Sequence, residues 1–188
     1  MTNRTKNVRA LCEGAIMVAM AEILGFLKIG HLVNGGSVSL MMLPIIVFAL
    51  RWGLGRGLLA GLCLGIVDFM LGGGIAIGWQ SIIGDYVIAC ALIGLAGIFA
   101  HKGEKGVIAG TVVGCLGRFL SVWVTGATLW GEYMPDTFLG MDMTNEWFYS
   151  LLYNGITVGT SCVVTIIICV ILCHIPGTRK LMLGEDLL

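Results

Sequence analysis

The sequence predicts an all-α, polytopic membrane protein with six transmembrane helices, and three observations predict that class. Hydrophobic residues make up 57% of the 188 residues, charged residues only 12%, and the mean hydropathy is +0.96. A soluble domain carries about twice that charged fraction. Six apolar segments follow one another along the chain, and basic residues occupy alternate gaps between them. We therefore expect a single membrane domain over residues 1–188.

The predicted spans differ in length. Crossing a hydrocarbon core of about 30 Å takes roughly 20 helical residues, so the second and third segments fall short of a full span. Short segments of this kind are typical of irregular backbone near the binding cavity of a transporter. They could equally be tilted, packed inside the protein or extended by polar turns. The six spans cover, in order, residues 10–29, 38–50, 57–71, 75–100, 107–130 and 147–175.

The first three spans have distinct local signals. The first follows three basic residues, and no small-residue cleavage site ends its apolar run, so we expect a retained helix rather than a signal peptide. The second is short and contains Pro44. The third begins in a glycine-rich stretch, RWGLGRGLLAGLCLG, whose small residues allow close helix packing. No G-K-[ST] follows these glycines, so they do not form a nucleotide-binding loop.

The basic residues predict the orientation. With six spans, all four basic clusters and both termini fall on one side, which the positive-inside rule assigns to the cytoplasm. The opposite side carries Lys28 and a loop, 131–146, with four carboxylates and no Lys or Arg. We therefore expect a multi-pass protein of the bacterial plasma membrane. The basic clusters are Arg4, Lys6 and Arg9; Arg51 and Arg56; Lys102 and Lys105; Arg179 and Lys180.

Five charged residues lie inside predicted spans, where a charge is costly and is a functional hypothesis by default. For Glu13, Glu22, Asp68 and Arg118 we favour structural pairing, with a ligand role as the alternative. Asp85 differs because Tyr86 adjoins it and Trp79 lies two turns earlier. It is the leading candidate for a binding residue.

The outer halves of the last two spans carry further aromatic and polar residues. Trp130 ends the fifth span, and Tyr149, Tyr153 and Asn154 lie within about a turn of each other in the sixth. An interfacial aromatic belt accounts for Trp130, but it does not account for a carboxylate and an amide inside spans. A carboxylate, an amide and stacked rings suit a flat, cationic, nitrogen-rich ligand.

Other function classes lack support in the sequence. The formal net charge is zero, so no nucleic-acid footprint is present. The seven cysteines form no C-x-x-C pair and are best interpreted as small buried hydrophobes. There is no H-E-x-x-H, G-x-S-x-G or Walker motif, so we expect neither an enzyme nor a cofactor or metal site. Uphill transport would then require an ion gradient or a separate ATPase.

The chain resembles the thiamine-specific substrate-binding (S) components of energy-coupling factor (ECF) transporters over nearly its whole length. Order and spacing of several short motifs carry the resemblance. They are NVRALCEGAIMVAMAEI (7–23), LPIIVFALRWGLGRGLLAGLCLGIVDFMLGG (43–73), DYVIACALIGLAGIF (85–99), TGATLWGEY (125–133) and YSLLYNGI (149–156).

The resemblance implies a six-helix protein that captures thiamine outside the cell. It then docks on a transmembrane coupling protein with two cytoplasmic ATPases, and ATP hydrolysis drives the vitamin inward. The family's small-residue docking surface on the first helix matches Ala15 and Ala19. Its binding residues match Asp85, Tyr86, Trp130, Tyr149 and Asn154.

The chain departs from the family pattern at three positions. Asp85 stands where the family has glutamate, Val122 where it has a histidine, and Asn34 or Gly35 where it has a tryptophan in the first outer loop. Trp79 and Trp123 are candidates for replacement rings, and Asn34 is a further candidate for contact with the ligand. The departures leave two alternatives open: the same fold with a related ligand, such as a hydroxymethylpyrimidine or another vitamin, or a stand-alone proton-coupled secondary transporter.

Overall fold

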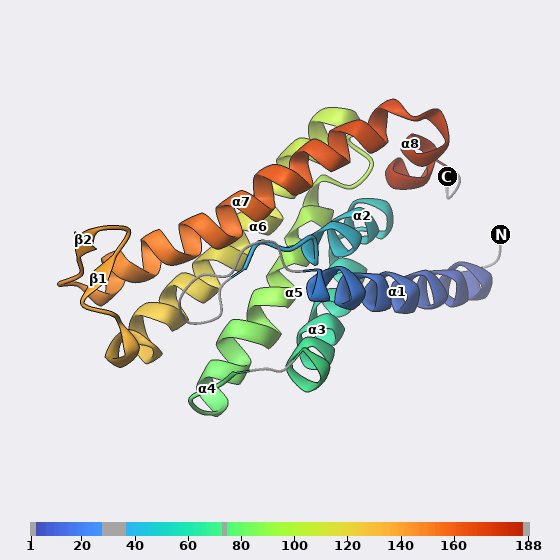
Figure 1. The fold of residues 1–188 in the computed structure, drawn as a ribbon. Helices are drawn as coiled ribbons and strands as arrows, with labels where there is room; N and C mark the ends of the chain where they lie inside the picture. Colours follow the sequence, from blue (N-terminus) through green and yellow to red (C-terminus); the bar gives the residue numbers. More distant parts are fainter. Residues whose placement is uncertain (1–2, 28–36, 73–74, 186–188) are drawn as a thin grey trace.

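The computed structural model describes residues 3–27, 37–72 and 75–185, and these form a helical bundle (Figure 1). The described elements are α1 (Asn3–Phe26), α2 (Met42–Trp52), α3 (Leu54–Leu71), α4 (Trp79–Ser81), η2 (Ile82–Ile88), α5 (Ala89–Ile93), η3 (Gly94–Phe99), α6 (Gly103–Leu129), η4 (Gly131–Tyr133), β1 (Thr137–Phe138), β2 (Met141–Asp142), α7 (Glu146–His174) and α8 (Pro176–Leu183).

Each predicted span corresponds to a helical segment, but only part of the membrane prediction is confirmed. Four segments are long and apolar enough to cross a bilayer: Leu54–Leu71, Trp79–Phe99, Gly103–Leu129 and Glu146–His174. α1 has the length but carries five charged residues, and α2 has only 11 residues. α1 begins at Asn3, seven residues before the predicted start. The prediction was based on hydropathy, and it missed the first two turns of α1 because they are polar.

α2 is short because it is packed inside the protein. Every residue of α2 except Leu43 is buried, and α2 contacts α1, α3, α6, α7 and α8. Such a helix does not need to match the thickness of the bilayer, since its neighbours surround it. α2 therefore forms the centre of the main hydrophobic core.

The irregular backbone lies in the fourth span. Irregular backbone in the short second and third spans was one of several possibilities left open by their length. α2 and α3 are regular, whereas the fourth stretch passes from α-helix to a π-helical segment, back to α-helix and then to a 3₁₀ segment. Its glycines allow backbone-to-backbone packing: a Cβ on Gly94 would lie 2.3 Å from Gly57, and one on Gly97 would lie 2.5 Å from Gly53. π-helical turns of this kind occur frequently at functional sites.

Two small elements were not predicted. A hairpin, β1–β2, precedes α7 in the chain. Asn145 caps α7, because its side-chain oxygen accepts hydrogen bonds from the backbone N–H groups of Trp147 and Phe148. α8 begins at Pro176, and proline suits the first turn of a helix. Figure 1 shows the hairpin at one end of the bundle and α8 at the other, the end at which α1 begins.

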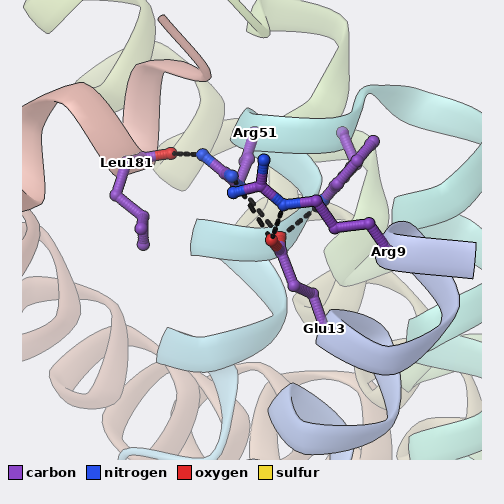
Figure 2. A network of polar contacts seen from close by, with 5 residues as sticks. Arg9, Glu13, Arg51 and Leu181 are labelled. Carbon is purple, nitrogen blue, oxygen red and sulfur yellow. Dashed lines mark hydrogen bonds and ion pairs between the residues drawn. The ribbon is translucent and has the colours of Figure 1, made fainter. Parts of the chain in front are cut away.

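A polar network ties α1, α2 and α8 together at that second end (Figure 2). The Glu13 carboxylate accepts from Arg9 Nε at 2.8 Å, Arg51 Nε at 2.8 Å and Trp52 Nε1 at 2.6 Å. Arg51, only 1% exposed, also donates from Nη1 to the carbonyl oxygen of Leu181 at 2.5 Å. Glu13 thus has the structural pairing that the sequence analysis favoured.

Candidate ligand-binding site

A polar cavity lies between α3, η2, α6 and α7, in two adjoining lobes of about 290 and 240 Å³. Small-molecule sites usually have volumes of about 300 Å³ or more, so the two lobes together are large enough for one small ligand. Because they share much of their lining, we describe them as one site, the ligand cavity. The residues that line both lobes are Asp68, Tyr86, Arg118, Val122, Trp130, Tyr153 and Asn154.

Asp85 lines the smaller lobe and is held by two neighbours. Its Oδ2 accepts hydrogen bonds from Trp130 Nε1 at 2.9 Å and from Ser81 Oγ at 3.0 Å. The bond to Trp130 joins the fourth helical stretch to the end of α6. The structure therefore brings together a carboxylate and an indole, 45 residues apart, that the sequence analysis had placed in one site.

The π-helical segment η2 sets the position of Asp85. Ser121 Oγ of α6 donates to the Gly84 carbonyl oxygen at 2.7 Å, which occupies an acceptor inside the irregular turn. A Cβ on Gly84 would lie only 2.4 Å from Thr125 Oγ1. The glycine therefore allows η2 to approach α6 closely enough for Asp85 to reach Trp130.

Tyr86 and Asn154 are also fixed by local bonds. The Tyr86 hydroxyl donates to the Ile75 carbonyl oxygen at 3.2 Å and accepts from the Ile75 N–H at 3.0 Å. Asn154 Nδ2 donates to the carbonyl oxygens of Ser150 at 3.0 Å and Val122 at 3.3 Å. With the amide nitrogen so engaged, Asn154 Oδ1 is the side-chain atom that can accept a hydrogen bond from a ligand.

Aromatic rings form one wall of the cavity. Tyr149 and Tyr153 lie one turn apart on α7, with ring centroids 5.7 Å apart and planes inclined by 38°. Phe138 of the hairpin packs edge-on against Tyr149 at 5.3 Å. Tyr149 lines the smaller lobe and Tyr153 lines both. Thus the unpredicted hairpin supports the aromatic wall from outside.

Two charged residues for which the sequence analysis favoured structural pairing also line both lobes. Asp68 comes from the end of α3 and Arg118 from the middle of α6, where its Nη1 lies 3.9 Å from Cys90 Sγ. With Asp85, the described residues that line the cavity include two carboxylates and one guanidinium, which together carry a formal charge of −1 when all are ionised. The sequence analysis singled out Asp68 and Arg118 because a charged residue inside a membrane span is costly and therefore uncommon.

Part of the larger lobe is lined by serine and threonine residues. It continues toward α1 and α2 and is lined there by hydroxyl groups. Ser161 Oγ accepts from the Ser39 N–H at 3.3 Å and donates to the Thr157 carbonyl oxygen at 2.7 Å. The residues whose hydroxyls line this part are Ser37, Ser39, Thr157 and Ser161. Sequence reasoning did not select them. Thr157 and Ser161 lie in α7, where such hydroxyls commonly bond the preceding turn, and Ser37 and Ser39 lie in the segment before α2, where serine is an ordinary loop residue.

Two of the candidate residues, Trp79 and Trp123, do not line the cavity. Trp79 is 67% exposed and lines neither lobe. Trp123 donates from Nε1 to the Trp147 carbonyl oxygen at 3.1 Å and packs edge-on against that ring, outside the cavity. Asn34 lies outside the described residues. Val122, at the position of the family histidine, lines both lobes, so that departure falls within the cavity.

The two predicted docking residues lie elsewhere, in an apolar groove of about 730 Å³ between α1, α2 and α3. Ala15 and Ala19 line its α1 side, and Leu59, Ala60 and Cys63 line its α3 side. The groove shares no lining residue with the ligand cavity. The two predicted surfaces, for ligand and for partner, are therefore spatially separate.

A charged cavity enclosed by helices long and apolar enough to cross a bilayer defines a multi-pass membrane transport protein. Comparison with known proteins gives the family. Residues 11–179 match the family model described as thiamine transporter protein, and the chain belongs to that family. It is accordingly a multi-pass protein of the bacterial cell membrane, with a role in transport rather than catalysis.

Individual relatives agree with this assignment. The chain is 33% identical to thiamine transporter ThiT of Bacillus subtilis, with 98% of both chains covered. It is 30% identical to ThiT of Lacticaseibacillus paracasei over 87% of this chain and 86% of that protein. A solved structure of ThiT from Listeria monocytogenes superimposes with a TM-score of 0.83 at 25% identity, covering 94% of this chain and 98% of that one.

A more distant neighbour shows how widely the fold is shared. The S-component for biotin from an ECF-type ABC transporter superimposes with a TM-score of 0.62 at 20% identity, over 97% of this chain and 99% of that one. At this identity the likeness concerns the fold alone. The mostly helical fold implied by the resemblance is thereby confirmed, whereas the six-span count and the location of the termini stay predictions.

Proposed function

We propose that this protein is the thiamine-binding S component of an ECF transporter. The observation that carries the proposal is the composition of the ligand cavity: a formal charge of −1, an aromatic wall and a fixed amide. Thiamine is a monocation in which a methylene bridge joins a planar aminopyrimidine ring to a planar thiazolium ring. Its charge balances that of the cavity, and its rings suit stacking on tyrosine and tryptophan.

The proposed contacts follow from the positions of the side chains. Asp85 provides the negative charge and accepts from the ligand's amine, while Asn154 Oδ1 accepts a further hydrogen bond. Trp130, Tyr149 and Tyr86 surround the rings. The hydroxyl-lined part of the larger lobe suits the hydroxyethyl tail of the vitamin, which both donates and accepts hydrogen bonds.

The proposed topology is six spans with both termini in the cytoplasm. The positions of the basic clusters support it. The direction of the helices also supports it, because Asn7 near the start of α1 bonds Arg56 near the start of α3. From this end both helices line the same groove, α1 as far as Ala19 and α3 as far as Val67. α1 and α3 therefore run parallel, as the first and third of six spans must. The ligand cavity then opens toward the outer half of the membrane.

Transport is proposed to require a separate module. The groove that contains Ala15 and Ala19 offers an apolar helix face for close contact with a transmembrane coupling protein, which two cytoplasmic ATPases would drive. The described residues contain no group of three or more metal-ligating side chains that would suggest another chemistry.

A second ligand is favoured by one observation. Val122 lines both lobes where the family has a histidine, so one ring contact is replaced by an aliphatic one. A bare hydroxymethylpyrimidine, which lacks the thiazolium ring, would lose least from that change.

A competition assay separates these functions. Purified protein is loaded with labelled thiamine and challenged with unlabelled thiamine, hydroxymethylpyrimidine and biotin. Displacement by thiamine at the lowest concentration supports the proposal, and stronger displacement by hydroxymethylpyrimidine supports the second ligand. In vesicles, uptake that needs the ATPase module supports the S component. Uptake without the module that an uncoupler abolishes would instead identify a proton-coupled transporter.

A further inference from the structure

Among the described residues that line the apolar groove between α1 and α3, a single one is charged, and it lies at one end. Arg56 lines the groove together with Asn7, and the remaining lining is apolar. No carboxylate lines the groove. Its shape and chemistry are therefore those of an amphiphile site: apolar walls with a cation at one end.

Arg56 is held in place without being neutralised. Its Nη2 donates to Asn7 Oδ1 at 2.8 Å, and its guanidinium carbon lies 4.8 Å from the centre of the Trp52 ring. Within residues 3–27, 37–72 and 75–185 it forms no ion pair, in contrast to Arg51, which pairs with Glu13 as Figure 2 shows. A guanidinium has five N–H donors, and only one is used by Asn7. The others can bind the oxygens of a phosphate.

The length of the groove matches one membrane leaflet. Along α3 the lining runs from Arg56 to Val67, which corresponds to roughly 16 Å at 1.5 Å per residue. Half of a hydrocarbon core is about 15 Å. Leu11 and Leu59 at the edges are 76% and 63% exposed, so the groove opens outward, toward the lipid in a membrane-spanning chain.

We propose that an anionic phospholipid of the inner leaflet occupies this groove when the protein is not docked. Its phosphate binds Arg56, and one acyl chain lies along α1 and α3 as far as Val67. Basic pockets between membrane helices on the cytoplasmic side are known to hold such headgroups. Docking of a partner on Ala15 and Ala19 then displaces this lipid. The proposal goes beyond thiamine binding and does not depend on it.

The test is native mass spectrometry of delipidated protein in micelles that contain equal amounts of phosphatidylglycerol and phosphatidylcholine. The wild type should retain one phosphatidylglycerol with a preference of about fivefold, the effect of one arginine at a membrane surface. Arg56→Gln should lower the preference to about one, and Arg56→Lys should keep most of it. Lys105→Gln, which removes a charge elsewhere on the same side, is the matched control and should change nothing.

Ala15→Leu fills the groove while it leaves Arg56 in place, and it should abolish lipid retention whatever the headgroup. Equal retention of both lipids by the wild type, or the same loss in Lys105→Gln as in Arg56→Gln, would overturn the proposal. Lipid retention by Ala15→Leu would also overturn the proposal. A wild type that retains no lipid would overturn it too, and would leave a protein partner as the occupant of the groove. Thiamine binding is measured on the same samples, so failure of the lipid site and failure of the thiamine proposal are distinguished.

Discussion

Replacing Asp85 with Asn removes one negative charge from the ligand cavity at almost constant volume. The carboxylate holds Trp130 Nε1 at 2.9 Å and Ser81 Oγ at 3.0 Å, and an amide oxygen can still accept from either. The expected loss is therefore that of a charge-assisted contact with the ligand, about 1–3 kcal/mol. This corresponds to a rise of roughly 5- to 150-fold in the Kd for thiamine.

The assay is calorimetric or fluorescence titration of the purified variants with thiamine. Asp142→Asn, in the exposed hairpin strand β2, removes the same charge outside the cavity and serves as the control. A neutral ligand separates charge from shape, because Asp85→Asn should weaken hydroxymethylpyrimidine less than thiamine. If Asp85→Asn and Asp142→Asn bind thiamine equally well, the carboxylate does not face the ligand and the assigned role is wrong.

Four further predictions concern packing, the docking face and the family departure. Gly84→Ala places a Cβ 2.4 Å from Thr125 Oγ1, so it should lower stability by about 1–3 kcal/mol and weaken thiamine binding; Gly155→Ala, which meets nothing within 4 Å, should do neither in thermal melts and titrations. Glu13→Gln leaves the buried Arg51 without its carboxylate and should lower stability by about 3 kcal/mol, the low end for a broken buried pair because Glu13 is 24% exposed; an unchanged melting temperature would contradict this. Ala15→Leu should leave thiamine binding intact and abolish uptake in vesicles that contain the complete transporter; surviving uptake would refute the docking face. Val122→His should tighten thiamine binding by about 1 kcal/mol through a ring contact, and weaker binding in titration would show that the lobe cannot hold a second ring.

The long spans could be predicted because their signal is composition. α6 and α7 begin within four residues of the predicted starts and end one residue before the predicted ends. The irregular fourth stretch could not be predicted from length, since it depends on Gly84, Gly94 and Gly97 meeting particular neighbours on α6 and α3. α8 was missed because it is only eight residues long and is held by tertiary contacts, including the bond from Arg51 to the Leu181 carbonyl oxygen.

Some residues of the candidate site could be predicted from the sequence and others could not. Asp85, Trp130, Tyr149 and Asn154 stood out because a polar or aromatic residue inside an apolar run is unusual, and all four line the cavity. Hydroxyl residues such as Ser161 carry no comparable signal, because in a helix they commonly bond the preceding turn.

Trp79 and Trp123 lie outside the cavity because proximity in sequence does not fix which way a ring points. Trp79 belongs to the same helical stretch as Asp85, yet its ring is 67% exposed. Trp123 lies one residue after Val122, and the next position on a helix turns by about 100°, which directs the ring to Trp147 instead of the cavity.

The measurement that tests the account most directly is a thiamine titration of the purified protein, followed by tryptophan fluorescence. Trp130 lines both lobes of the cavity, so a bound thiazolium or pyrimidine ring should quench it. Saturable quenching at submicromolar thiamine with one site per chain, and a much smaller signal in Trp130→Phe, is the predicted result. Absence of saturable thiamine binding by any direct method would contradict the assignment of this cavity to thiamine.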